Sequence, residues 1–196
     1  GWHFVMTSGL VLHLSPHGFD EGMHGRYAWV QDRPIFCLEG IKRLQAVLKH
    51  LAISPSQIFL IPDRDSEILA YATATEFQLP IKPWPPEGSQ EPGLIVVYDL
   101  KQLSQPLWQQ LSVHHPGQIL FCHAVCFTED FPVAPDVHTY FYQFNTPPWG
   151  EKRVQSEDQT TWEILPPLEG APEEIAKLIT ESDISDANLD DIPSQI

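Results

Sequence analysis

A short acidic segment, residues 63–67, carries side chains suited to binding a cation. Asp63, Asp65 and Glu67 lie close together in sequence, and Asp99 follows a later, strongly apolar segment. If the apolar segments that precede these acids are parallel strands, the acids meet at the sheet edge where α/β proteins bind ligands. Carboxylate oxygens there favour a divalent metal or a cationic ligand. Alternatively, the acids cap a helix and interact with its dipole. We adopt this second interpretation and predict no metal site.

A second group of metal-ligand types lies near the beginning of the sequence. His13, His17 and His24 have Asp20 and Glu21 between them. Their spacing matches no single face of a helix or strand, and no cysteine accompanies them, so we interpret them as ordinary polar loop residues.

Sequence motifs for covalent catalysis are absent. No Gly-x-Ser-x-Gly elbow, phosphate-binding loop or dinucleotide fingerprint occurs. Cys122 and His123 are adjacent and would point to opposite faces of a strand, which is poor geometry for a dyad. With Cys37 and Cys126 the chain has three cysteines, an odd number without framework spacing. That count favours a reducing, cytoplasmic location, with Cys122 and Cys126 acting as small buried hydrophobes.

The elements expected to position these residues form an α/β pattern. Residues 57–61 and 94–98 are continuous apolar runs typical of strands covered on both faces. Between them, residues 67–77 show helical spacing, and Pro80 ends the helix. This βαβ order predicts a mostly parallel sheet flanked by helices, with residues 119–127 as a neighbouring strand.

Further elements are expected on both sides of this unit. Residues 26–30 and 34–38 flank a polar turn and predict an N-terminal β hairpin, and residues 40–51 predict an amphipathic helix. Residues 100–111 are a helix candidate with Pro106 in its first turn, and residues 139–144 are an aromatic strand.

Ordered pieces over residues 41–151 resemble type I phosphoribosyltransferases, especially the purine-salvage kind. The pieces are the turn 61–66, the helix with Ala70 and Ala74, the exit 77–80, the strand 94–99 and the late segments 125–127, 135–136, 140–142 and 148–151. The resemblance implies that family's fold, with a diphosphate-binding turn at 62–66 and a ribose-phosphate loop at 99–105.

The loops depart from what an active member of that family needs. Tyr98 replaces one of two acids, no glycine lies between Gly93 and Gly117, and Asp63 and Asp65 place negative charge where diphosphate would sit. Backbone amides that wrap a phosphate need small residues around them. We therefore expect a degenerate phosphoribosyltransferase-like fold without that activity, serving as a non-catalytic regulatory or protein-interaction protein.

Two alternatives remain open. In a divergent active phosphoribosyltransferase acting on a nucleobase or related acceptor, Asp99, Lys101 and Ser104 would do the work of the usual loop, and Mg²⁺ could take part. A carboxylate–metal enzyme would instead use Asp63, Asp65 and Asp99. The candidate ligand-binding residues are therefore Asp63, Arg64, Asp65, Ser66, Asp99, Lys101 and Ser104, and no residue is assigned as catalytic.

Charge narrows the range of partners. The net charge is −15: residues 1–150 hold 14 acidic and 8 basic side chains, and residues 151–196 hold 12 and 3. Without clustered Lys and Arg, binding to nucleic acid or to an anionic membrane is disfavoured. No apolar run is long enough for membrane insertion, and the first residues lack the features of a signal peptide. A protein partner is expected.

The C-terminal part differs in composition from the rest. Residues 1–150 are expected to form one α/β domain, and the acidic segment 151–196 to be partly ordered or to dock on a surface. Within it, residues 162–165 could add an edge strand and residues 172–182 a short helix, while residues 183–196 are expected to be mobile. Trp84, Trp108 and Trp162 become interface anchors if they are exposed.

Overall fold

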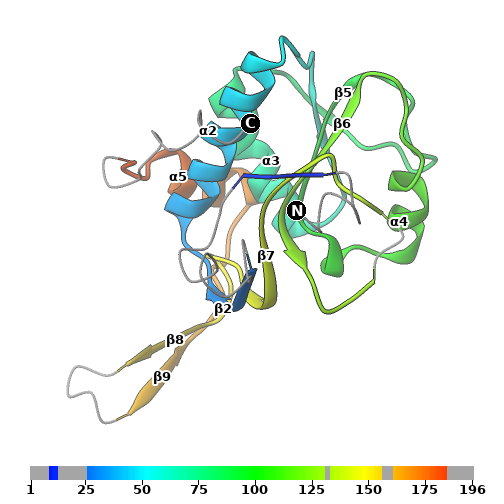
Figure 1. Ribbon diagram of the computed structural model, residues 1–196. Coiled ribbons are helices and arrows are strands. Elements are labelled where there is room, and N and C mark those ends of the chain that lie inside the picture. Colours follow the sequence, from blue (N-terminus) through cyan, green and yellow to red (C-terminus); the bar gives the residue numbers. More distant parts are fainter. Residues whose placement is uncertain (1–8, 13–25, 131–132, 156–160, 185–196) are drawn as a thin grey trace.

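A seven-stranded, parallel sheet forms the centre of the molecule (Figure 1). The computed structural model describes residues 9–12, 26–130, 133–155 and 161–184. The strand order is β1-β7-β6-β5-β3-β4, and β2 pairs with the same strand, β7, as β1 does. The strands are β1 (Leu10–Val11), β2 (Arg26–Gln31), β3 (Ile58–Leu60), β4 (Ile81–Pro83), β5 (Gly93–Asp99), β6 (Gln118–Cys126) and β7 (Val137–Thr146).

The central strands confirm the sequence prediction. β3 pairs parallel with β5, with Ile58 opposite Leu94, and β5 pairs parallel with β6, with Leu94 opposite Ile119. Every residue of β5 is buried, as expected for a strand covered on both faces. The predicted fold class, a mostly parallel sheet flanked by helices, is confirmed.

The predicted N-terminal hairpin is wrong. β2 forms, but it pairs parallel with β7, and residues 34–38 open the helix α2 (Pro34–His50). Pro34 lies in the first turn, where its missing N–H removes no helical hydrogen bond and its fixed φ suits the helix. The run Pro-Ile-Phe-Cys-Leu is too short to show a helical period by itself, which is why its apolar character resembled a strand.

Helices cover both faces of the sheet (Figure 1). On one face, α2 packs with α3 (Arg64–Phe77) and α5 (Pro172–Thr180) over a core that includes Ile41, Leu69 and Val96. The 3₁₀ turn η2 (Leu100–Gln102) and α4 (Gln105–Leu111) cover the other face, around Phe59 and Val97. Among the described residues, no helix combines the length and apolar character needed to span a bilayer.

Local chemistry explains where α3 begins and ends. The Asp63 carboxylate accepts a hydrogen bond from the Ser66 backbone N–H at 2.9 Å, which satisfies one of the unpaired N–H groups of the first turn. Ala70, Ala72 and Ala74 are buried, and their small side chains let the helix lie close to the sheet. The helix ends at Gln78, which is left-handed with φ of 55°, two residues before Pro80.

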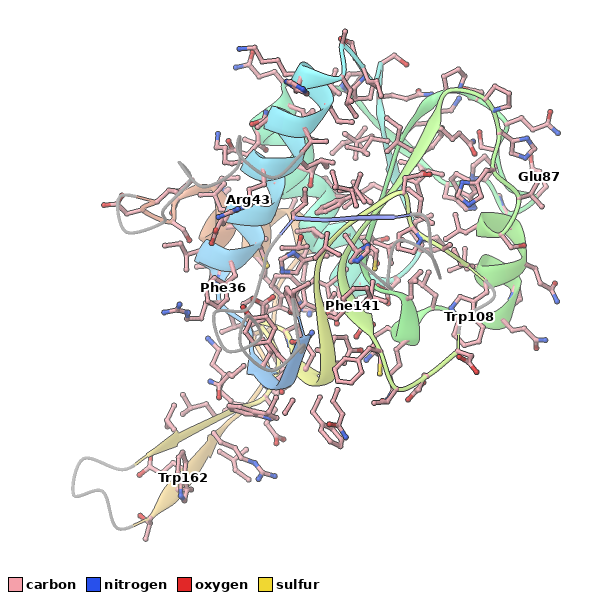
Figure 2. The ribbon with its side chains drawn as sticks, viewed as in Figure 1. Phe36, Arg43, Glu87, Trp108, Phe141 and Trp162 are labelled. Carbon is pink, nitrogen blue, oxygen red and sulfur yellow. The ribbon has the colours of Figure 1, made fainter. Side chains whose placement is uncertain are left out.

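The segment after Trp149 forms two different structures. β8 (Lys152–Gln155) and β9 (Trp162–Leu165) make a separate antiparallel hairpin that projects from the domain (Figures 1 and 2), so the prediction that residues 162–165 extend the main sheet is wrong. α5 instead returns to the domain, where Ile175, Ala176 and Ile179 join the core. Of the segment 183–196, residues 185–196 lie outside the described part, and Ile184 packs against that core.

Candidate functional site

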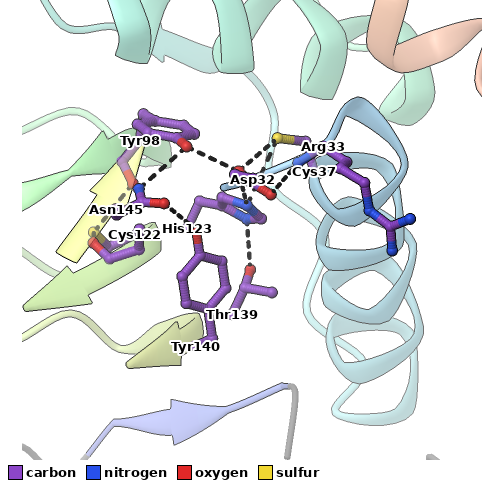
Figure 3. Close-up of polar contacts among 10 residues, drawn as sticks. Asp32, Arg33, Cys37, Tyr98, Cys122, His123, Thr139, Tyr140 and Asn145 are labelled. Carbon is purple, nitrogen blue, oxygen red and sulfur yellow. Dashed lines mark hydrogen bonds and ion pairs between the residues drawn. The ribbon is translucent and has the colours of Figure 1, made fainter. Parts of the chain in front are cut away.

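A buried polar cluster lies where several strands approach their carboxyl ends (Figure 3). Asp32 directly follows β2, and its backbone N–H donates to the Thr146 carbonyl at the end of β7 at 3.0 Å. Tyr98 is the penultimate residue of β5, and His123 lies on β6. Cys37 comes from the first turn of α2, so the cluster joins the sheet to the helix above it.

Asp32 is the centre of the cluster. Its Oδ2 accepts hydrogen bonds from the Tyr98 hydroxyl at 2.8 Å and the Cys37 thiol at 3.4 Å, and lies 3.1 Å from His123 Nε2. Its Oδ1 accepts from the Arg33 backbone N–H at 2.8 Å. The Asp32 side chain is fully buried. Burial of a carboxylate is unfavourable unless it is paired and hydrogen-bonded, and this one has four neighbouring polar groups.

Cys37 is held as a neutral thiol. Burial raises the pKa of the Cys37 thiol well above its ordinary value, and the adjacent Asp32 carboxylate raises it further. Because the thiolate is the nucleophilic form of cysteine, Cys37 is not an activated nucleophile in this state. Its sulfur nevertheless lies 3.6 Å from His123 Nε2, so a cysteine and a histidine meet here after all, although they are not neighbours in sequence.

The position of His123 is fixed on both sides of its ring. Nδ1 lies 3.0 Å from the Thr139 hydroxyl on β7, while Nε2 faces Asp32 and Cys37. Gly40 of α2 lies directly over this pair: a Cβ at that position would be 2.6 Å from Thr139 Oγ1. The helix can therefore approach the cluster this closely because position 40 has no side chain.

A chain of hydrogen bonds leads away from Asp32 along the sheet. The Tyr140 hydroxyl donates to Asn145 Oδ1 at 3.1 Å, and Asn145 Nδ2 donates to the Tyr98 hydroxyl at 3.2 Å, which in turn donates to Asp32. Burial, reinforced by the Asp32 carboxylate, raises the pKa of Tyr98 and of Tyr140 well above the usual tyrosine value. Both hydroxyls therefore remain protonated donors.

An open pocket of about 230 Å³ adjoins the cluster. Thr139 and Tyr140 belong both to the hydrogen-bonded cluster and to the pocket wall, and most of the lining is apolar. The pocket is lined by Tyr27, Trp29, Val30, Gln31, Phe36, Glu39, Thr139 and Tyr140. Glu39 is paired with Arg43 at 2.7 Å, so its charge is compensated within α2.

A second buried carboxylate lies at the end of β5. Asp99 accepts hydrogen bonds from the Tyr142 hydroxyl and, at 3.0 Å, from the Lys101 backbone N–H. Burial raises the pKa of Asp99 to about 6, although the bond from Tyr142 partly offsets this effect. Both Asp99 oxygens are thus used inside the protein.

The other candidate ligand-binding residues also have internal roles. Asp63 caps α3, and its Oδ2 accepts from the Ser66 hydroxyl at 2.7 Å. Asp65 accepts from Trp149 Nε1 at 2.6 Å, and burial raises the pKa of this carboxyl group. The Ser66 hydroxyl in turn accepts from the Tyr98 backbone N–H at 3.1 Å.

The remaining three candidates lie nearer the surface. Arg64 donates to the Leu168 carbonyl at 2.8 Å, Lys101 pairs with Glu129 at 2.5 Å, and Ser104 is the N-cap residue of α4, where its side chain makes no capping bond. Of the seven candidates, only Asp63 and Ser66 bond directly to each other through their side chains, and they do so as a helix cap.

The three tryptophans differ in exposure. Trp84 is only 7% exposed, packs edge-on against Phe59 and donates to Gln110, so it lacks the exposure of an interface anchor. Trp108 is half-buried, and its Nε1 donates to the Leu100 carbonyl at 2.8 Å. Trp162 is 67% exposed on β9 (Figure 2). His13, His17 and His24 lie outside the described residues.

Sequence reasoning missed Asp32, Cys37 and His123 as a group. The sequence pattern places Asp32 in a hairpin turn and Cys37 in a strand, and it brings neither residue next to His123, which is 91 and 86 positions away from them. The available signal was Pro34, which is typical of a helix start and would have placed Cys37 on the first turn, beside Asp32.

Comparisons with known proteins found a similarity among solved structures but not among family models or curated proteins. No family model matches the chain, and no curated protein matches it. Among solved structures, the chain is similar to a purine phosphoribosyltransferase from Pyrococcus horikoshii Ot3, with 17% identity and a TM-score of 0.47; the match covers 68% of this chain and 99% of that one. The similarity concerns the chain trace and assigns no substrate or activity to this protein.

Proposed function

We propose that this chain is a non-catalytic protein-interaction protein on a degenerate phosphoribosyltransferase-like fold, and that the β8–β9 hairpin is its contact surface. The observation that carries the proposal is the exposure of this hairpin: every residue of β9 is exposed, including Trp162 and Ile164, and so is Arg153 of β8. Large apolar side chains gathered on one projecting element mark interaction sites.

The register of the hairpin places its two most exposed apolar side chains on one face. Trp162 and Ile164 alternate along β9 and so share a face, and Arg153 of β8, which lies opposite Ile164, is on that same face. Trp162 is 67% and Ile164 59% exposed. A two-stranded hairpin alone is marginally stable in water, so a partner that covers this face stabilises the hairpin as it binds.

The residues of the two loops at 62–66 and 99–105 are poorly suited to phosphoribosyl transfer. The sequence lacks the glycines that would let backbone amides converge on phosphates, and Asp63, Asp65 and Asp99 accept hydrogen bonds from the protein's own Ser66, Trp149 and Tyr142. A diphosphate with its metal would have to displace these bonds.

Charge indicates the kind of partner. The chain carries a net charge of −15, so a second copy is repelled at long range, whereas a protein with basic groups around an apolar groove is attracted. We therefore assign the hairpin to a basic partner protein rather than to self-association.

The proposal can be tested by photo-crosslinking in the source cells, with a photoreactive residue at Arg153, on the same face as Trp162 and Ile164. A captured partner would then be purified, and its affinity measured for the wild type, for Trp162→Ala and Ile164→Ala, and for two controls. Leu51→Ala and Val113→Ala are suitable controls because both side chains are more than half exposed but lie on the body of the domain.

We expect Trp162→Ala to weaken binding by about 30-fold or more, which corresponds to the loss of about 2 kcal/mol typical of a central aromatic anchor. The controls should bind like the wild type. Equal binding by Trp162→Ala and the wild type would rule out the hairpin as the contact surface. A wild-type dimer that is lost in Trp162→Ala would replace the basic partner with a second copy.

A further inference from the structure

Three side chains with different ligand atoms meet in the buried cluster. Among the residues that the structure describes, Asp32, Cys37 and His123 are the one group of three or more His, Cys, Asp or Glu side chains whose ligand atoms all lie within 4.8 Å of one another. Carboxylate oxygen, thiolate sulfur and imidazole nitrogen are the three protein ligands of zinc. We propose that these three residues bind one divalent transition-metal ion of the zinc type.

The ligand atoms have the spacing that such an ion requires. The Asp32 Oδ2–Cys37 Sγ, Cys37 Sγ–His123 Nε2 and Asp32 Oδ2–His123 Nε2 distances are 3.4, 3.6 and 3.1 Å. A tetrahedral zinc ion holds sulfur at about 2.3 Å and nitrogen or oxygen at about 2.0–2.2 Å, which separates its ligands from one another by about 3.3–3.6 Å. The three atoms therefore form a triangle close in size to one face of the tetrahedron.

The surrounding groups support this arrangement. His123 Nδ1 lies 3.0 Å from Thr139 Oγ1, so a proton on Nδ1 can be donated to that hydroxyl while the Nε2 lone pair faces the other two ligands. The second Asp32 oxygen is held by the Arg33 backbone N–H, and the Tyr98 hydroxyl donates to the first. Bonds of this kind orient the ligands of metal sites and tune their basicity.

Charge and proton balance are also satisfied. Binding sends the thiol proton of Cys37 to solvent and leaves His123 neutral, with its proton on Nδ1. The thiolate and the Asp32 carboxylate then carry two negative charges, which the two positive charges of the ion cancel. A buried site with no net charge avoids the large cost of an uncompensated charge in a low-dielectric interior.

The ligand set also selects among metals. A soft thiolate together with imidazole favours zinc over magnesium and calcium, which prefer oxygen ligands alone. Three protein ligands leave a fourth position for a water molecule or another small ligand. The cluster is separate from the proposed interaction surface, because β8 and β9 contribute no residue to it.

The test uses the full chain, freed of metal with a chelator and then titrated with Zn²⁺ against a chromogenic competitor. Native mass spectrometry gives the stoichiometry, and Co²⁺ substituted for Zn²⁺ reports thiolate ligation through its charge-transfer absorption. The variants are Asp32→Asn, Cys37→Ser and Thr139→Val. Cys126→Ser is the matched control, because Cys126 is equally buried but lies outside the three-residue group.

We expect one ion per chain, a thiolate–Co²⁺ band that Cys37→Ser abolishes, and no change in Cys126→Ser. Asp32→Asn and Cys37→Ser should weaken Zn²⁺ binding more than about 100-fold, and Thr139→Val by about 10–100-fold, the usual effect of removing an outer-shell partner. Should a ligand variant fail to fold, the wild-type stoichiometry and Co²⁺ spectrum still decide the question. Micromolar Zn²⁺ that gives no one-to-one complex, or Asp32→Asn binding as tightly as the wild type, would show that the cluster is a hydrogen-bonded network only.

Discussion

Replacing Gly40 with alanine tests whether the close approach of α2 to the sheet is essential to the cluster. A Cβ at position 40 would lie 2.6 Å from Thr139 Oγ1 and 3.1 Å from His123 Nδ1. The first distance is shorter than real Cβ contacts allow, so an atom must move. Thr139 is 2% exposed and β-branched, so its side chain has little freedom to rotate away.

The expected effect is a balance of three contributions. Alanine is favoured over glycine within a helix by about 1 kcal/mol, which alone would stabilise the protein. Against this, overpacking a core costs about 1–3 kcal/mol, and losing the buried Thr139–His123 hydrogen bond costs about another 1–3 kcal/mol. The free energy of unfolding should therefore fall by about 1–5 kcal/mol, which lowers Tm by about 2–4 °C per kcal/mol for a chain of this size.

The measurement is urea and thermal unfolding of Gly40→Ala followed by circular dichroism. Ala46→Gly, at an exposed position of the same helix, is the control for helix propensity and should destabilise the protein by about 1 kcal/mol. In a Thr139→Ala background the closest atom, Thr139 Oγ1, and Thr139 Cγ2 are gone and only His123 Nδ1 remains, at 3.1 Å, so Gly40→Ala should be much less harmful there. If Gly40→Ala is as stable as the wild type or more so, the close approach does not constrain position 40 and the reasoning fails.

Three further predictions concern the sheet edge. The pKa of Asp99, raised to about 6 in the folded state, means that the folded state holds this proton more tightly than the unfolded state. The stability of the wild type relative to Asp99→Asn should therefore fall by about 3 kcal/mol in total between about pH 3 and 7, with about 2 kcal/mol of the fall between pH 4 and 6, and level off above pH 7. A flat difference in unfolding titrations would contradict the burial argument. Asp63→Ala should lower the free energy of unfolding by about 0.5–2 kcal/mol, and Asp63→Ser should lower it by less, because serine can still cap α3. Equal losses of stability in chemical denaturation would count against the capping role. Calorimetry with phosphoribosyl pyrophosphate and Mg²⁺ should show no tight binding, and assays with common purine and pyrimidine bases should show no turnover. The reason is that the glycine-poor loops cannot present converging backbone amides to the phosphates. Micromolar affinity that disappears in Asp99→Ala would instead support the divergent transferase.

The parts of the fold that could be predicted are those in which local sequence and tertiary structure agree. The apolar runs of β3 and β5 are buried on both faces, and such strands need no partner to be identified. α3 carries its own start signal in Asp63 and its stop in Pro80. In contrast, the parallel pairing of β2 with β7 joins segments more than 100 residues apart and leaves no local trace in either.

The cluster could not be predicted for the same physical reason. Asp32 and His123 are 91 residues apart, and their contact exists because β2 and β6 both flank β7 while α2 crosses above them. A short apolar run such as residues 34–38 is compatible with a strand or a helix. When it is interpreted as a strand, Cys37 is separated from Asp32. The exposure of Trp84 was left open in the same way, because its packing on Phe59 also depends on a residue distant in sequence.

The acid expected at the end of β5 has a counterpart elsewhere in the cluster. β5 ends with Tyr98 and Asp99, and only the second of these is an acid. The Tyr98 hydroxyl donates to Asp32, so a carboxylate remains beside this strand, but it comes from the end of β2 and is 1% exposed. A carboxylate that faces inward and is bonded to Tyr98 and Cys37 is poorly placed to hold a solvent-borne sugar phosphate, and well placed to hold a single buried cation. Tyr98 thus bears on both proposals: it offers no carboxylate at the end of β5 for phosphoribosyl transfer, and its hydrogen bond orients the proposed metal ligand.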